Sequence, residues 1–164
     1  ATHNFLLPPG ESAAKTSRRL IEARRMGFSR FNFLPAYFVP WTPAQLEGLA
    51  LTFSALRVVL SKMAAAGRAA EVVNLTRRGS TPLYNDGLVV DADGEVYSSN
   101  LVLADAVWPH RKRLSLGHVR RPRALAVRAR SETSQVLKDS FSDEILASSL
   151  AADAALTAFC RALA

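Results

Sequence analysis

The chain has 164 residues, 49% of them apolar, and carries a formal net charge of +7. This length supports one domain, or two closely packed halves, with a real hydrophobic core. The single cysteine, Cys160, excludes an internal disulfide and cannot supply the roughly three or four ligands of a zinc or iron–sulfur site. We therefore expect a colourless, metal-free, cytoplasmic protein in which Cys160 packs as a small core residue, with a reactive thiol as the alternative.

The apolar runs of the chain stay shorter than the roughly 20 residues that span a bilayer, so we expect no membrane segment. The first ten residues, A-T-H-N-F-L-L-P-P-G, lack the basic and long apolar regions of a signal peptide. They also lack an initiator methionine, which indicates a processed protein or a piece of a longer one.

The first segments predict a βαβ unit. Thr2–Leu7 is short and apolar, as in a strand, and a helix over residues 11–26 follows, which Ser12 can cap and Gly27 ends. Residues 28–38 then alternate like a second strand. Because a helix of about four turns separates the two strands, we expect them to be parallel.

A second long helix follows this unit. Thr42, Pro43 and Gln45 form an N-terminal capping signal, and apolar residues recur at helical spacing over residues 46–66. Residues 70–75 then predict another short strand.

The rest of the chain predicts a β-hairpin and C-terminal helices. Residues 88–90 and 95–97 form the two strands, joined by a tight turn, Asp91-Ala92-Asp93-Gly94. The later elements are an extended segment at 114–119 and helices at 132–137 and 142–163. The expected fold class is α/β (α+β): a βαβ unit, a hairpin and C-terminal helices.

The hairpin sequence is distinctive. Residues 87–100, G-L-V-V-D-A-D-G-E-V-Y-S-S-N, are followed by L-G-H-V at residues 116–119. This pattern resembles the auxiliary hairpin of radical S-adenosylmethionine (radical SAM) proteins of the SPASM/twitch type. The resemblance implies a cysteine ligand of an iron–sulfur cluster where Ser98 and Ser99 stand here. D-A-D-G is also similar to the start of a calcium loop, but no glutamate follows at the twelfth loop position, so we expect a structural turn without metal.

The βαβ unit resembles the last strands of a radical SAM partial barrel, whose active site lies at the C-terminal mouths of the strands. The resemblance divides the chain into a barrel end, residues 1–66, and a SPASM/twitch-like hairpin domain with the C-terminal helix, residues 67–164. It implies these substrate-facing candidates: His3, Asn4, Asn32, Tyr37, Trp41 and Asp86. For the polar candidates we prefer the simpler interpretation of hydrogen bonding in strands and turns, and for the aromatic candidates that of ring packing. We expect His3, near a chain end, to be incidental.

The C-x-x-x-C-x-x-C motif of radical SAM enzymes is absent from the chain. We therefore assign no catalytic residue and expect no enzyme activity from the chain alone. If the chain is a fragment, the resemblance implies that a 4Fe–4S cluster and S-adenosylmethionine bind upstream of Ala1. The implied partners are an upstream barrel domain and a peptide substrate.

A basic strip spans residues 111–130, with eight basic residues and no acid. Its members are Arg111, Lys112, Arg113, Arg120, Arg121, Arg123, Arg128 and Arg130. The strip indicates either a solvated surface or a site for an acidic partner, and no nucleic-acid motif accompanies it. The alternative function is therefore a stand-alone binding or scaffold module that uses the basic strip to hold an acidic partner.

Overall fold

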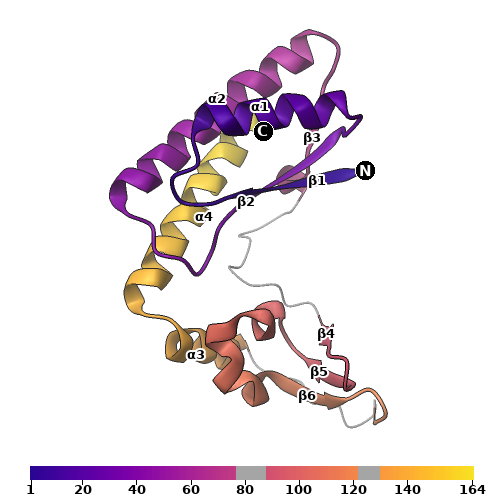
Figure 1. Cartoon of the computed structure of the whole chain (residues 1–164), viewed down its shortest axis with the longest axis vertical. Coiled ribbons are helices and arrows are strands. Elements are labelled where there is room, and N and C mark those ends of the chain that lie inside the picture. Colours follow the sequence, from indigo (N-terminus) through magenta and orange to yellow (C-terminus); the bar gives the residue numbers. More distant parts are fainter. Residues whose placement is uncertain (77–87, 122–129) are drawn as a thin grey trace. The chain divides into compact units, whose positions relative to one another are not determined.

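The structure is a computed structural model, and it describes residues 1–76, 88–121 and 130–164. The chain forms two compact units, one of Ala1–Thr81 with Ala147–Ala164 and one of Pro82–Leu146 (Figure 1). The expectations for Asp86, Arg123 and Arg128 lie outside the described residues.

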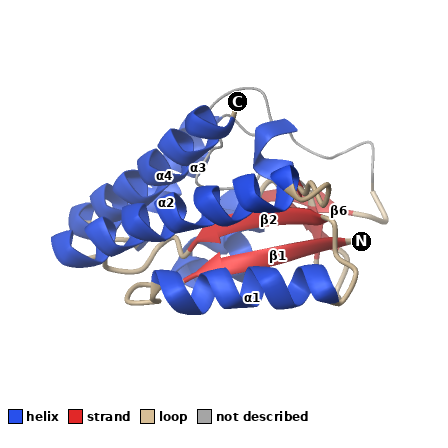
Figure 2. Ribbon diagram, turned by 90° about the horizontal axis from the view of Figure 1, so that it is seen from above, coloured by secondary structure: helices blue, strands red, loops and turns tan. Residues whose placement is uncertain are grey.

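The first unit contains a parallel sheet of three strands in the order β1-β2-β3. Its strands are β1 (Thr2–Leu7), β2 (Arg30–Pro35) and β3 (Glu71–Val72). Helix α1 (Ala13–Arg25) connects β1 to β2 and lies along these strands (Figure 2). The predicted βαβ unit with parallel strands is therefore confirmed.

The helices of this unit begin where their capping residues predict. Lys15 N donates to Ser12 Oγ at 3.3 Å at the start of α1. Helix α2 (Pro43–Ala65) starts with the predicted capping box, in which the Thr42 and Gln45 side chains each accept from the other's backbone N–H. These contacts satisfy N–H groups that have no partner inside a helix.

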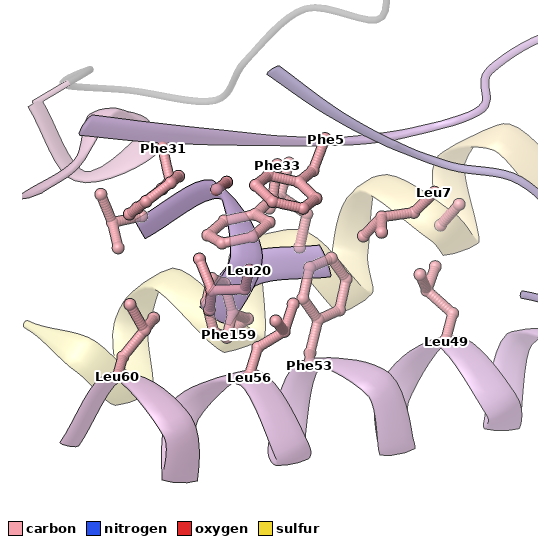
Figure 3. Close-up of a cluster of buried hydrophobic side chains, with 14 of the residues drawn as sticks. Phe5, Leu7, Leu20, Phe31, Phe33, Leu49, Phe53, Leu56, Leu60 and Phe159 are labelled. Carbon is pink, nitrogen blue, oxygen red and sulfur yellow. The ribbon is translucent and has the colours of Figure 1, made fainter. Parts of the chain in front are cut away.

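One face of the sheet forms the hydrophobic core. Phe5, Phe31 and Phe33 are fully buried there. Phe159 meets the Phe33 ring edge-on at 5.6 Å between centroids and stacks on Phe53 at 4.8 Å (Figure 3). The helices contribute these further core residues: Leu20, Ala23, Leu49, Leu56, Leu60, Met63, Ala152 and Leu156.

The C-terminal helix α4 (Asp143–Leu163) belongs mainly to this first unit. The expected division at residue 66 groups this helix with the hairpin instead. The reason for the difference is the apolar stripe of α4, because Ala152, Leu156 and Phe159 pack into the same core as the sheet.

The strand expected at residues 70–75 is shorter in the structure. Only Glu71 and Val72 pair with β2, and the 3-10 helix η1 (Val73–Thr76) follows. The Asn74 side chain explains the change, since its amide accepts from Phe33 N and donates to Phe33 O, both at 2.9 Å. The Asn74 side chain thus makes the hydrogen bonds to β2 that the backbone of a longer β3 would make.

The second unit contains a three-stranded antiparallel sheet in the order β4-β5-β6. Its strands are β4 (Val89–Val90), β5 (Glu95–Tyr97) and β6 (Ser115–His118), and the predicted hairpin is confirmed. Two 3-10 helices, η2 (Asn100–Leu103) and η3 (Asp105–Leu114), separate β5 from β6, and α3 (Arg130–Ser140) follows. The chain is an α/β protein with C-terminal helices, as its pattern predicts.

Helices α2 and α4 are long and apolar enough to cross a membrane by length and composition alone. Each also contributes a buried stripe to the core of the first unit. Packing on the sheet therefore accounts for part of their apolar character.

Candidate functional site

The second face of the parallel sheet differs from the core face. Side chains alternate along a strand, so Asn4, Leu6, Asn32 and Leu34 point away from the buried phenylalanines. Leu6 is 56% exposed, and none of these four residues belongs to the core cluster that α1, α2 and α4 form with the sheet. Within the described residues, the sheet is therefore covered by helices on one face only.

A pair of amides lies at the centre of this open face. Asn4 and Asn32 are register partners, and Asn32 Nδ2 donates to Asn4 Oδ1 at 3.1 Å. Asn32 is only 9% exposed, and its Oδ1 accepts no hydrogen bond within the described residues. A buried acceptor of this kind requires a donor, which a bound molecule or water can supply.

A cavity of about 350 Å³ lies at the C-terminal end of β1. Its walls come from the loop after β1, the first turn of α1 and the first half of α2. Trp41 forms part of the wall and is held in place because its Nε1 donates to Ala36 O at 2.8 Å. The lining is mainly apolar, and Glu11 brings a carboxylate to its edge.

The Glu11 carboxylate, just before α1, is held by side chains of that helix. Its Oε1 accepts from Arg19 Nη1 at 2.5 Å and from Thr16 Oγ1 at 3.1 Å, and Lys15 Nζ lies 3.5 Å from Oε2. Burial by itself would raise the pKa of Glu11. The hydrogen bonds from Arg19 and Thr16 and the nearby positive charges outweigh burial and lower the pKa below 4.5. Glu11 is therefore suited to anchoring α1 as an anion rather than to donating a proton.

The loop after β2 is fastened to α4. Tyr37 Oη donates to Asp153 Oδ1 at 2.8 Å, and Phe38 N donates to Ser149 Oγ at 2.9 Å. Phe38 has a φ of 61°, a left-handed conformation that is unfavourable for a bulky residue. The contacts with α4 hold this conformation in place.

Three groups at or near this contact, Tyr37, Asp153 and Cys160, have raised pKa values. Burial, followed by the Asp153 charge, raises the pKa of Tyr37 and the pKa of the Cys160 thiol. Burial also raises the pKa of Asp153, more than the hydrogen bond from Tyr37 lowers it. The environment of Cys160 thus favours the neutral thiol, which agrees with a packed residue rather than a reactive one.

The candidates expected at one barrel mouth lie in four places. Asn4 and Asn32 meet on the open face, Trp41 lines the cavity at the C-terminal end of β1, and Tyr37 contacts α4. His3 lies near the start of β1, with its ring centroid 4.6 Å from Phe5 and 5.0 Å from Phe28. Among the five candidates that the structure describes, it therefore brings together only the two asparagines.

The Asp-Gly turn and the L-G-H-V segment of the hairpin sequence contact each other. His118 Nε2 lies 2.8 Å from Asp93 O, and Val119 N donates to Gly94 O at 2.9 Å. A Cβ added to Gly94 would lie 2.7 Å from His118 Cε1, and the φ of +90° also requires glycine. The Asp-Gly turn and the L-G-H-V segment thus form one packed unit.

The two aspartate carboxylates of the hairpin turn accept hydrogen bonds from the turn itself. Asp91 Oδ1 accepts from Ala92 N, and Asp93 Oδ1 accepts from Glu95 N. Ser98 Oγ is buried without a hydrogen-bond partner in the described part of the chain. No group of three or more His, Cys, Asp or Glu side chains in the described ranges is arranged to hold a metal ion.

The basic strip is partly neutralised by acids from elsewhere in the second unit. Arg111 lies over the Trp108 ring at 3.8 Å and 3.9 Å from Asp91 Oδ2, and Arg113 Nη1 bonds Asp139 Oδ2 at 2.5 Å. Three other members are exposed and take part in no ion pair between described residues: Lys112, Arg120 and Arg121. The charge available to a partner is therefore smaller than the sequence suggests.

A second basic region was missed by sequence reasoning. A cavity of about 410 Å³, here called the α1–α2 cavity, lies between the C-terminal halves of α1 and α2. Its basic residues are Arg24, Arg25, Lys62 and Arg68, and its apolar wall consists of Ile21, Val59 and Met63. The sequence pattern assigns the two arginines of α1 to an exposed face. The available signal was that both helices carry a basic residue in the last turn and that a glycine follows each helix.

Comparisons with protein-family models, with curated proteins and with solved structures gave no match to the chain.

Proposed function

We propose that this chain is the C-terminal substrate-cavity and auxiliary region of a radical SAM-like protein. In this proposal the chain is not catalytic alone and holds no iron–sulfur cluster of its own. The observation that carries the proposal is the one-sided parallel sheet, with helices on one face and the Asn4–Asn32 pair on the other.

Parallel sheets are normally covered on both faces, so the open face needs a covering element. In a (β/α) barrel, helices cover the outer face and side chains fill or line the inner face. The open face of β1 and β2 fits an inner face, because it carries polar groups as well as Leu6 and Leu34. β1 is also an edge strand, to which a further parallel strand can pair. The buried Asn32 Oδ1 then becomes an acceptor for a substrate donor.

The hairpin supports the same proposal through its resemblance to the SPASM/twitch type. The residues present do not fit an iron–sulfur cluster, because Ser98 and Ser99 stand where the resemblance implies a cysteine ligand and Cys160 lies on α4 in the first unit. We therefore assign the hairpin a structural role beside the substrate, with its shape kept by the contact of Gly94 with His118. The cluster and S-adenosylmethionine would be held upstream of Ala1.

The test uses the full native reading frame that contains these residues. We expect a C-x-x-x-C-x-x-C motif upstream, iron in the purified protein, and reductive cleavage of S-adenosylmethionine. Asn32→Leu should lower substrate-dependent turnover, while Ser54→Ala, on the exposed side of α2, should not. Cys160→Ala should leave the iron content unchanged. A native frame that starts near Ala1, with no such motif, would overturn the proposal.

A stand-alone binding module remains the second candidate, and the exposed Lys112, Arg120 and Arg121 favour it. Such a module would hold an acidic peptide by charge, so its affinity should fall as salt rises above physiological levels. Titration with a poly-glutamate peptide tests this idea. Binding that does not change with salt, or that survives replacement of all three residues by glutamine, would count against it.

A further inference from the structure

The α1–α2 cavity combines an apolar wall with an excess of positive charge. Its volume of about 410 Å³ lies within the range of roughly 300–1,000 Å³ that is common for small-molecule sites. Four of its seven lining residues are basic, and none is acidic among the residues that the structure describes.

The basic residues of the cavity are not neutralised by acids of the chain. The ion pairs between described residues involve neither Arg24, Arg25, Lys62 nor Arg68. Arg24 Nε is also buried, and it has no hydrogen-bond acceptor in the described ranges. A buried guanidinium N–H of this kind requires an acceptor, and an anion in the cavity would supply one.

The basic side chains of the cavity are not needed to cap the ends of α1 and α2. At the end of α1, Gly27 N and Phe28 N donate to Arg24 O and Ala23 O, both at 3.1 Å. At the end of α2, Gly67 N and Arg68 N donate to Ala64 O and Met63 O at 3.0 and 2.9 Å. The backbone itself therefore satisfies terminal carbonyls at both ends, as in the Schellman motif.

The helix dipoles compensate only part of the charge. Two helix C-termini together supply roughly one negative charge, against four positive side chains. The remaining positive charge and the apolar wall favour a ligand that has both an anionic head and an apolar tail.

We propose that the α1–α2 cavity binds a small organic phosphate with a short apolar chain. The phosphate accepts hydrogen bonds from Arg24, because a guanidinium group matches the geometry of phosphate oxygens. The positive charges of Arg25, Lys62 and Arg68 attract the phosphate. The apolar chain lies against Ile21, Val59 and Met63. This site lies at the C-terminal ends of the helices and does not depend on the function proposed above.

Calorimetric titration of the whole chain with octyl phosphate tests the proposal. Two matched probes separate the contributions of head and tail: octyltrimethylammonium carries the same tail with a positive head, and inorganic phosphate has no tail. We expect octyl phosphate to bind most tightly and the cationic probe not to bind. Vesicles that contain phosphatidic acid serve as a further probe, which presents the phosphate as a lipid headgroup.

The variants remove charge without removing apolar contacts. Lys62→Gln with Arg68→Gln changes two exposed residues and should weaken octyl phosphate binding by about tenfold or more. Adding Arg24→Gln to this variant should weaken octyl phosphate binding further. Arg18→Gln is the matched control, because Arg18 is exposed on the same helix but does not line the cavity, and it should change the affinity by less than about twofold.

Three results would overturn the proposal: equal affinity for inorganic phosphate and octyl phosphate, an equal loss of affinity in the Arg18 variant and in the Lys62 and Arg68 variant, or binding to the vesicles without binding to octyl phosphate. If Arg24→Gln fails to fold, as judged by circular dichroism, the variant of Lys62 and Arg68 still decides the outcome.

Discussion

The two units of the chain are stabilised in different ways. The first unit has an aromatic core in which Phe5, Phe31, Phe33 and Phe159 join a sheet to three helices. The second unit has strands of only two to four residues, and specific polar contacts and tight turns connect its segments. Burial of apolar area is distributed over many contacts, whereas a turn depends on a single residue. We therefore expect core substitutions to dominate in the first unit and backbone substitutions in the second.

The largest effect should come from Phe33→Ala in the first unit. Phe33 is fully buried and touches the rings of Phe5 and Phe159, so its loss leaves a cavity. We expect a loss of about 3–5 kcal/mol in the free energy of unfolding. Urea unfolding in a Trp108→Phe background measures it, because the fluorescence then comes from Trp41, which is buried in the first unit.

A matched control for this prediction is Leu6→Ala, because Leu6 lies on the open face of the same sheet and is 56% exposed. It should change the unfolding free energy by less than about 1 kcal/mol. If the two variants lose equal stability, the assignment of one face to the core and the other to a partner is wrong.

In the second unit, we expect Gly94→Ala to cause a large loss of stability. Positive φ makes alanine unfavourable there, and its Cβ would meet the His118 ring at 2.7 Å. We expect a loss of about 2–3 kcal/mol in local stability, from backbone strain and overpacking together. Hydrogen exchange of the Val119 amide, which bonds Gly94 O, reports the loss directly.

Gly10→Ala separates these two contributions. Gly10 has a φ of +82°, but a Cβ there would meet nothing within 4 Å. It should lose only the conformational part, about 1–2 kcal/mol. If Gly94→Ala loses no more than Gly10→Ala, the contact between the turn and His118 does not stabilise the hairpin.

The same contrast explains how much of the fold the sequence predicts. Apolar periodicity and capping residues such as Thr42 with Gln45 predict the helices and strands of the first unit closely. The end of β3 was not predictable in this way, because it depends on the Asn74 side chain meeting Phe33 from a distant segment. The packing of α4 on the sheet was missed for a similar reason, since an apolar stripe does not specify its partner.

The candidate site shows the same limit. The resemblance to a barrel predicts polar residues on β1 and β2, and Asn4 does meet Asn32. The resemblance does not distinguish the two faces of each strand. His3 was therefore grouped with Asn4 and Asn32, although its ring lies against Phe5 on the core side of the sheet. The α1–α2 cavity was missed because it requires two helix ends to be neighbours, which the spacing of Arg24 and Lys62 in the sequence does not reveal.

Glu11 provides a pH-dependent test of a polar contact in the first unit. Its folded pKa is lowered, so its stabilising effect is present above pH 4.5 and is lost as the pH falls through the folded pKa. Glu11→Gln should reduce the free energy of unfolding at pH 7 by about 1–2 kcal/mol, because Arg19 is partly solvated and the pair is only partly buried. It should also flatten the decline of this free energy as the pH falls below 4.5. Urea unfolding at a series of pH values measures both effects.

The control is Glu22→Gln, because Glu22 lies on α1 and outside every ion pair of the described residues. It should leave the acid decline of the native chain intact. If Glu11→Gln declines with acid as steeply as the native chain, the hydrogen bonds from Arg19 and Thr16 do not stabilise the anion.

The smallest effect should come from the exposed ion pair of Arg30 with Glu71, which joins β2 to β3. It is bidentate, at 2.8 and 3.1 Å, but both side chains are nearly half exposed. We expect a coupling energy of about 0.5 kcal/mol from a double-mutant cycle of Arg30→Gln and Glu71→Gln, falling as salt is added. A coupling above about 2 kcal/mol would show that β3 depends on this pair rather than on burial of Val72. The first unit would then share the reliance on single polar contacts that distinguishes the second.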